Sequence, residues 1–285
     1  MPMNAVGGHF QRLPERHRQR RPAAAVLDSG LRRNDGPDRG QPPGASIDDR
    51  YDAAVRGLAV EHDPTGHAAL IGEAMERRGV ELEPFRVVPD VANPVSDREF
   101  PDPCDYDLVV VLGAIWSVYD DAKIGTWIHR EVEFVQRADA AGQPVLGVCF
   151  GGQVLSAALG GTVSRAPAPE FGWMSIDTDE PDGLSPGPWF QWHYDRFTVP
   201  EGATELARNA NGSQAFRRGR SLGLQFHPEV DGSLLGEWIG FGGDELRAHG
   251  VDVDALIAET ARIESSAARR TQQLVDWFLE DVAEQ

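Results

Sequence analysis

The sequence predicts a doubly wound α/β fold, in which helices cover both faces of a mostly parallel sheet. Three observations favour this fold. Short apolar runs alternate with segments of helical spacing over roughly the first hundred residues after position 57. Two of these runs, in "YDLVVVLGA" and "PVLGV", are almost wholly apolar, as expected of central strands covered on both faces. A corner with two glycines then separates "PVLGV" from the next helical segment.

The expected elements of this sheet follow one another in a regular order. A strand in "GLAVEH" (57–62) precedes a helix in "GHAALIGEAMERRG" (66–79), for which Gly79 is a suitable C-cap. Strands are expected in "VELEPFRVV" (80–88) and "YDLVVVLGA" (106–114). One helix is expected over "IGTWIHREVEFVQRADAAG" (124–142), because its apolar residues recur at helical spacing, and the strand "PVLGV" (144–148) comes after it.

The second half of the chain has a different pattern. Residues 161–224 carry short strand-like runs and turns, so we expect a β-rich segment at one edge of the sheet. Three helical segments follow, over 234–250, 253–270 and 271–282. We therefore expect one domain over residues 55–230 and a helical C-terminal extension over 231–285 that completes it.

Residues 1–54 differ from the rest in composition. They are rich in Arg, Gly and Pro and show no sustained period of 2 or 3.6, which predicts a disordered tail. A basic docking arm and a segment foreign to the native protein are the alternatives. This segment has nine arginines against seven acidic residues, so the net charge of −18 comes entirely from the rest of the chain.

Composition excludes several classes of protein. A strongly acidic domain repels phosphate backbones, so no nucleic-acid partner is expected. The chain has no apolar run of transmembrane length and no secretory signal, so no membrane partner is expected. Its two cysteines give no disulfide framework, which favours a reducing cytoplasm. The eight histidines lack metal-ligand spacing, so no metal site is expected, and Cys104 lies in an incidental loop.

The other cysteine, Cys149, lies at the strand-to-helix corner "GVCFGG" between Gly147 and Gly151. A nucleophile at such a corner needs small neighbours, because the backbone there is crowded. The first N–H groups of the following helix favour both a thiolate and an oxyanion. From this stretch alone, a catalytic nucleophile and a buried core cysteine remain alternatives.

The segment "LGLQFHPEV" favours the nucleophile. His227 and Glu229 are two residues apart on an extended chain, so their side chains point to the same side. Glu229 is then placed to orient the imidazole of His227, which accepts the proton of Cys149. This is the arrangement of nucleophile, base and orienting acid found in catalytic triads.

At these residues the sequence resembles the class I, or triad-type, glutamine amidotransferases, which have a flavodoxin-like fold. The family pattern G-x-C-x-G-x-Q is matched by Gly147, Cys149, Gly151 and Gln153, and H-P-E is matched at residues 227–229. Within the family, "SVYD", "GLQFHPEV" and "WHYDRFTVP" are most similar to the amidotransferase domain of GMP synthases. The ATP-pyrophosphatase domain of those enzymes has no counterpart in this chain.

The resemblance implies a set of site residues and a reaction. Cys149, His227 and Glu229 correspond to a triad that hydrolyses the glutamine amide through a γ-glutamyl thioester, without a cofactor. The backbone N–H groups of Ala114 and Phe150 correspond to the oxyanion hole. Further positions correspond to substrate-binding residues: Gly113, Gln153, His193 and Asp195. One departure is that "GAI" stands where the family commonly has two glycines and a proline.

Several alternatives remain open from the sequence. The implied partner is a synthase that receives ammonia from glutamine, but a γ-glutamyl peptidase or hydrolase of the same fold would use the same residues. An α/β-hydrolase-like thiol enzyme and a binding module without activity are less consistent with the motifs. Trp189, Trp192 and Tyr194 either line a substrate pocket or serve packing. The helices inserted after Glu229 either cap the site, or dock a partner, or only shield the sheet.

Overall fold

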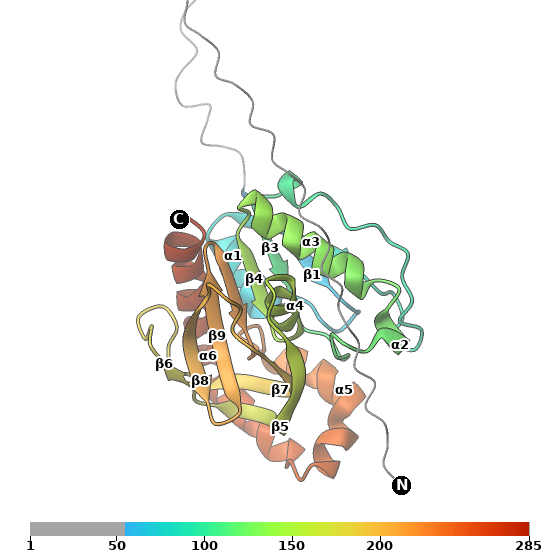
Figure 1. Cartoon of the computed structure of the whole chain (residues 1–285). Helices are drawn as coiled ribbons and strands as arrows, with labels where there is room; N and C mark the ends of the chain where they lie inside the picture. The colour runs from blue at the N-terminus through green and yellow to red at the C-terminus, as the bar shows by residue number, and fades with distance from the viewer. Residues whose placement is uncertain (1–54, 285) are drawn as a thin grey trace, which may run out of the picture. The chain divides into compact units, whose positions relative to one another are not determined.

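The computed structural model describes residues 55–284, and the expectations for residues 1–54 lie outside that range. Its main sheet has eight strands in the order β2-β1-β3-β4-β10-β9-β8-β6 (Figure 1). The first five strands are parallel and have the order of a flavodoxin-like sheet, which confirms the predicted fold class. They are β1 (Val55–Glu61), β2 (Val80–Arg86), β3 (Leu108–Val111), β4 (Val145–Val148) and β10 (Ser221–Leu224).

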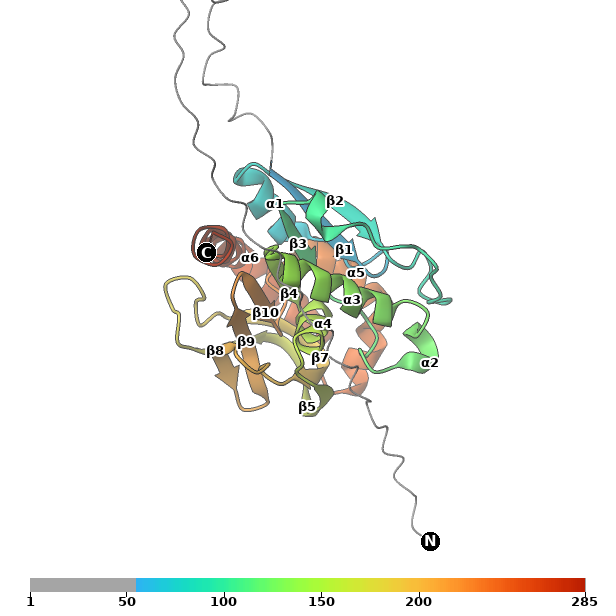
Figure 2. The ribbon, with the colours of Figure 1, turned by 45° about the horizontal axis from the view of Figure 1, so that its top comes forward.

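Helices cover both faces of this sheet (Figures 1 and 2). On one face, α1 (Ala69–Arg77) and α6 (Val253–Trp277) pack on alternate residues of β3, Leu108 and Val110. On the other face, α3 (Ile128–Ala141) and α4 (Phe150–Ala158) pack on Val109 and Val111. The sheet is therefore buried on both sides, as the continuous apolar run in β3 predicts.

The β-rich middle of the chain forms two structures. The strands β6 (Asp177–Thr178), β8 (Thr204–Asn209) and β9 (Gly212–Arg218) extend the main sheet at one edge, where the sequence predicted a β-rich segment. The strands β5 (Val163–Met174) and β7 (Trp189–Phe197) instead pair with each other in a separate antiparallel sheet. This second sheet lies beside the end of β10, since Phe190 of β7 forms a β-bridge with His227.

Two helix boundaries differ from the sequence prediction. The segment 124–142 contains the end of a short helix, α2 (Asp121–Ile124), and then α3. The break allows Trp127 to leave helical geometry, with φ of −138°, and to bury its ring while Nε1 donates to the Pro94 carbonyl at 2.9 Å. The helices expected at 253–270 and 271–282 join into α6, because no Gly or Pro separates them, and a π-helical turn (Phe278–Val282) ends them.

The helical extension after Glu229 is present. α5 (Gly232–Ala248) is capped by Asp231, whose carboxylate accepts from the Leu234 N–H, and α6 is capped in the same way by Asp252. Figure 1 shows α5 beside the β5–β7 sheet. The remaining short helix, η2 (Pro103–Asp105), carries Cys104, which is exposed. No helix formed by residues 55–284 is both long enough and apolar enough to span a membrane.

Candidate active site

Cys149 occupies the corner between β4 and α4 in a strained conformation. Its φ is +51° and its ψ is −106°, a region that residues with a side chain rarely adopt. A β-carbon on Gly147 would lie 2.6 Å from the Gly151 carbonyl oxygen, and one on Gly151 would lie 1.9 Å from that of Val111. The corner therefore requires glycine at both positions that the sequence analysis singled out. The thiol is buried at this turn, 5% exposed, and lines a cavity.

His227 and Glu229 form a buried pair next to this corner. The Nδ1 atom of His227 lies 2.7 Å from Oε1 of Glu229, and the His227 N–H donates to the Phe190 carbonyl at 2.8 Å. Burial of the ring lowers the pKa of His227, but the charges and hydrogen bonds of Cys149 and Glu229 outweigh it and raise that pKa well above its usual value. The structure therefore favours a thiolate–imidazolium arrangement at the turn.

A cavity of about 470 Å³ opens at this corner. Among the residues that line it are eight of the nine predicted site residues: Gly113, Ala114, Cys149, Phe150, Gln153, His193, Asp195 and His227. Glu229, the ninth, is buried and contacts the cavity through His227. The structure thus brings together residues that are up to 116 positions apart in the chain. Their catalytic and binding roles stay predictions.

Gly113 lies directly against the His227 ring. A β-carbon there would lie 3.0 Å from Cε1 of His227 and 4.0 Å from the β-carbon of Cys149. The following N–H, that of Ala114, donates to none of the described residues, and the same holds for the N–H of Phe150 at the start of α4. Two backbone donors at the cavity are therefore without a protein acceptor within residues 55–284.

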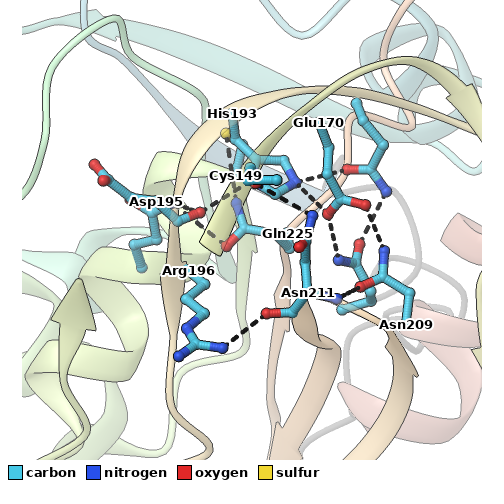
Figure 3. Close-up of polar contacts among 12 residues, drawn as sticks. Cys149, Glu170, His193, Asp195, Arg196, Asn209, Asn211 and Gln225 are labelled. Carbon is cyan, nitrogen blue, oxygen red and sulfur yellow. Dashed lines mark hydrogen bonds and ion pairs between the residues drawn. The ribbon is translucent and has the colours of Figure 1, made fainter. Parts of the chain in front are cut away.

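A buried polar network supports the site from behind (Figure 3). Gln225 donates weakly to Sγ of Cys149 at 3.9 Å and lies 3.4 Å from the Gln153 amide. Gln153 in turn lies 3.4 Å from the Asp195 carbonyl oxygen, to which His193 also donates from Nδ1 at 2.9 Å. The network therefore links the cysteine corner to β7.

Behind His193 lies a buried carboxylate that the sequence analysis did not identify. Nε2 of His193 is 3.1 Å from Oε2 of Glu170, and Asn209 donates to the other oxygen at 2.7 Å (Figure 3). Burial alone would raise the pKa of Glu170, but His193 and nearby asparagines lower it below its usual value. His193 is thereby fixed on both sides of its ring, so its main contacts are with protein groups.

The side chain of Asp195 is held by two hydroxyl groups from the loop after β3. Ser117 donates to Oδ2, and Tyr119 donates to Oδ1 at 2.8 Å. Both donors belong to the "SVYD" stretch that contributed to the family resemblance. The carboxylate therefore ties the loop that carries Gly113 to strand β7.

A second buried histidine–glutamate pair lies on the far side of Gly113. His62, at the end of β1, donates from Nδ1 to the Gly113 carbonyl at 2.9 Å, and its Nε2 is 2.7 Å from Oε1 of Glu131 on α3. Both side chains are wholly buried. Sequence reasoning missed them because they are 69 residues apart and belong to no motif. The position of His62 at the carboxyl end of a central strand was the one signal available.

Helix α5 forms one wall of the cavity. Its contributions are Trp238, Phe241, Gly242 and Glu245. The Trp238 ring packs edge-on against His227 at 4.9 Å between centroids, and its Nε1 donates to the Thr65 carbonyl at 2.8 Å. Phe241 is 76% exposed at the rim. The inserted helix therefore reaches the mouth of the cavity, as one of the sequence alternatives expected.

The aromatic residues of β7 divide between the two roles considered from sequence. Trp192 and Tyr194 line the cavity, and Tyr194 donates its hydroxyl to Glu245 of α5 at 2.6 Å. Trp189 is buried and stacks on Phe226 at 4.8 Å between centroids, so it serves packing. Within residues 55–284, no group of three or more His, Cys, Asp and Glu side chains is arranged to hold a metal ion.

Comparisons with known proteins agree with this site. The family model described as glutamine amidotransferase class-I matches residues 68–241, more than half of the chain. The amidotransferase-type subunit of the glutamine-hydrolyzing GMP synthase of Sulfurisphaera tokodaii is 35% identical over 136 residues, covering 44% of this chain and 69% of that protein. Gamma-glutamyl peptidase 5 of Arabidopsis thaliana is 34% identical over 163 residues, covering 51% of this chain and 63% of that protein.

Other relatives are longer, and solved structures share the fold. The GMP synthase of Aeropyrum pernix is 36% identical over 113 residues, and the match spans only 22% of its length. A glutamine amidotransferase from Thermotoga maritima superimposes with a TM-score of 0.70 at 26% identity, covering 80% of this chain and all of that one. One from Methylobacillus flagellatus has a TM-score of 0.68 at 21% identity, covering 81% and 96%. This second likeness concerns the fold alone.

Proposed function

Because this chain belongs to the class I glutamine amidotransferase family, we propose that it hydrolyses a γ-glutamyl amide through a cysteine nucleophile. The observation that carries the proposal is Cys149 at a strained corner, facing a cavity shared with His227, whose ring is held by Glu229. Nucleophile, base and orienting acid are the three parts that such chemistry needs.

The reaction follows from this geometry. The Cys149 thiolate attacks the γ-carbonyl carbon of the substrate, and the developing oxyanion accepts hydrogen bonds from the N–H groups of Ala114 and Phe150. His227, as imidazolium, gives its proton to the leaving amine as the C–N bond breaks, which leaves a γ-glutamyl thioester. Water activated by His227 then attacks the thioester, and glutamate and the free thiol result. No metal or organic cofactor takes part in this scheme.

The remaining predicted residues bind the substrate in this proposal. Gly113 gives the γ-carbonyl room beside His227, since a β-carbon there would press on the ring. Gln153 lies at the start of the polar network and faces the cavity. Asp195 and His193 shape the floor of the cavity, and Asp195 also fixes the loop that carries the oxyanion donors.

Two outcomes of this chemistry differ in the amine that leaves. In an amidotransferase, glutamine releases ammonia to a partner synthase, and the similarity to the Sulfurisphaera GMP synthase protein supports this outcome. In a γ-glutamyl hydrolase, a larger amine leaves into water, and the similarity to a gamma-glutamyl peptidase supports this second outcome. One structural observation favours the second, because α5 extends the cavity past Cys149 with the apolar side chains of Trp238 and Phe241. Ammonia has no use for an apolar wall.

A substrate panel tests the proposal. Purified protein is incubated with glutamine, glutathione and γ-glutamyl-phenylalanine, and glutamate release is measured alongside trapping of the γ-glutamyl thioester by hydroxylamine. We expect release from at least one compound and a loss of about 10⁴-fold or more in Cys149→Ala. Release that persists in Cys149→Ala, or its absence with every compound and with added synthase, would contradict the proposal.

A matched pair of variants separates the two outcomes. Phe241→Ala is expected to lower kcat/KM for γ-glutamyl-phenylalanine about tenfold, because loss of apolar contact costs about 1–3 kcal/mol, and to leave glutamine unaffected. Ile257→Ala on α6, which removes another exposed apolar side chain away from the cavity, is the control. Equal values for both compounds in Phe241→Ala would favour the amidotransferase.

A further inference from the structure

The pair formed by His62 and Glu131 contacts the same loop as the proposed oxyanion hole, and it has no place in the triad. His62 follows β1, while the loop Leu112–Ala114 follows β3, its neighbour in the sheet. Parallel neighbours end at the same edge, so the imidazole lies directly beside the loop. Its Nδ1 is 2.9 Å from the Gly113 carbonyl oxygen.

The proton on Nδ1 of His62 is fixed by its surroundings. A carbonyl oxygen can only accept, so Nδ1 must donate to Gly113. At the other ring nitrogen, Glu131 accepts as a carboxylate. Burial lowers the pKa of His62, but the charge of Glu131 and the hydrogen bonds to Glu131 and Gly113 outweigh it and raise that pKa. The donor to Gly113 is therefore retained at neutral pH.

The ring of His62 is also fixed in position. It packs edge-on against Phe150 at 4.7 Å between centroids and is tilted against Trp127 at 5.7 Å. Glu131 lies in the first turn of α3, where its backbone N–H donates to the Trp127 carbonyl at 3.0 Å. The carbonyl of Gly113 thus meets a rigid donor rather than a mobile side chain.

This contact determines where the next N–H points. In a trans peptide the C=O and N–H groups point in opposite directions. Since the carbonyl of Gly113 is directed at His62, the N–H of Ala114 points away from it, toward the cavity that Gly113, Ala114, Cys149 and His227 line. Rotation of this peptide by half a turn would put a carbonyl oxygen where the oxyanion forms, and glycine offers little resistance to such rotation.

We propose that His62, held by Glu131, is a positioning residue that fixes the Gly113–Ala114 peptide with its N–H toward Cys149 and so completes the oxyanion hole. The proposal rests on the proposed function. It also accounts for the departure of this loop from the Gly-Gly-Pro pattern of the family, because a rigid donor below the loop can do what a rigid loop sequence does elsewhere. Neither His62 nor Glu131 touches the reacting atoms.

Two variants of equal size test the contact. His62→Leu removes the donor to Gly113, whereas His62→Asn places an amide N–H where Nδ1 was. We expect His62→Leu to lower kcat about 10²-fold with KM unchanged, the usual effect of losing one oxyanion-hole donor. We expect His62→Asn to keep at least tenfold more of kcat than His62→Leu. A packing role for the buried ring predicts the reverse order, with the apolar Leu better tolerated, and that order would overturn the proposal.

Alkylation of Cys149 by iodoacetamide is the second readout. This reaction needs the thiolate but forms no oxyanion, so its rate should stay within about threefold of the wild type in both His62 variants. A parallel fall in alkylation and kcat would overturn the proposal, because His62 would then act on the nucleophile. His129→Leu, at an exposed histidine on the same helix as Glu131, is the control and should match the wild type in kcat.

The outcome is decisive even where a variant is unstable. Folding is checked by circular dichroism, and if neither His62 variant folds, Glu131→Gln keeps the shape of the pair and removes its charge. We then expect kcat to fall at least threefold with unchanged KM and alkylation rate, and an unaltered kcat would overturn the proposal. An inactive wild type would refute the proposed function itself, whereas an active wild type with a fully active His62→Leu would refute only the positioning role.

Discussion

Two buried histidine–glutamate pairs flank Gly113, and they differ in what the rest of each ring faces. In both His227–Glu229 and His62–Glu131, a ring nitrogen lies 2.7 Å from a glutamate oxygen. The His227 ring contacts the cavity, whereas the His62 ring is closed off from it. One pair therefore has access to a substrate and the other does not.

The difference teaches how identical side chains acquire different roles. His227 faces Cys149, whose sulfur can both release and accept a proton, so a proton can move through this ring. His62 lies between a carbonyl and Glu131, which are both acceptors, so its Nδ1 proton has no destination. The first pair suits acid–base chemistry, and the second suits rigid support of a loop.

The largest expected effect breaks the pair that faces the cavity. His227→Leu is expected to lower kcat by about 10⁴-fold or more, because the base and acid of every step is lost. Alkylation of Cys149 should slow as well, since the imidazolium no longer stabilises the thiolate. Stopped-flow assays of iodoacetamide reaction and of glutamate release measure the two rates.

This result sharpens the contrast with His62→Leu, where alkylation is expected to continue at the normal rate. If Cys149 of His227→Leu is alkylated as fast as in the wild type, His227 does not support the thiolate. The two pairs would then be indistinguishable by this measurement, and the comparison drawn above would fail.

The next effect concerns pH. Glu229→Gln removes one of the charges that raise the pKa of His227 against the lowering effect of burial. The imidazolium then loses its proton at lower pH, so the alkaline limb of the kcat/KM profile should move to lower pH. We also expect kcat/KM at its optimum to fall about 10²-fold, less than for the loss of His227 itself, because the acid orients the base.

Glu131→Gln is the matched control for this profile. Glu131 lies on the other pair, and its replacement should leave the alkaline limb where it is, although kcat falls. A profile that shifts equally in both variants would mean that the two carboxylates act through a shared field rather than through their own histidines.

The sequence carried the first pair and not the second for a physical reason. Cys149, His227 and Glu229 occupy a turn and an extended segment whose geometry is set locally, so spacing alone indicates which side chains meet. His62 and Glu131 meet only because β1 and α3 are brought together by the sheet. In the sequence, Glu131 resembles any acidic residue in the first turn of a helix.

The fold was predictable for similar reasons. Continuous apolar runs identified β3 and β4, because a strand covered on both faces needs no polar residue. The separate β5–β7 sheet was not predictable, since its pairing depends on distant partners such as Glu170 and His193. The contact of α5 with the cavity was expected only as one of several alternatives, because helical periodicity does not show what an apolar face covers.

The smallest expected effect concerns a third buried pair, His193–Glu170, which supports the floor of the cavity. The pKa of Glu170 is lowered below its ordinary value of 4.5, since His193 and nearby asparagines outweigh the effect of burial. A lowered pKa means that ionised Glu170 stabilises the fold above pH 4.5 and that this stability is lost as pH falls through the lowered value. Glu170→Gln should therefore lower Tm at pH 7 by roughly 3–6 °C, for a loss of about 1–2 kcal/mol.

The pH dependence of that loss separates it from an effect of shape. The Tm difference between Glu170→Gln and the wild type should shrink as pH falls below about 4.5, because the wild-type carboxyl is then protonated and uncharged as well. Glu76→Gln, at an exposed position of α1, should show no Tm difference at either pH. We expect kcat of Glu170→Gln to stay within about fivefold of the wild type, since this pair touches neither Cys149 nor the oxyanion donors. A Tm difference that persists unchanged at low pH would assign Glu170 a packing role, and a loss of kcat as large as that of His62→Leu would make it part of the site.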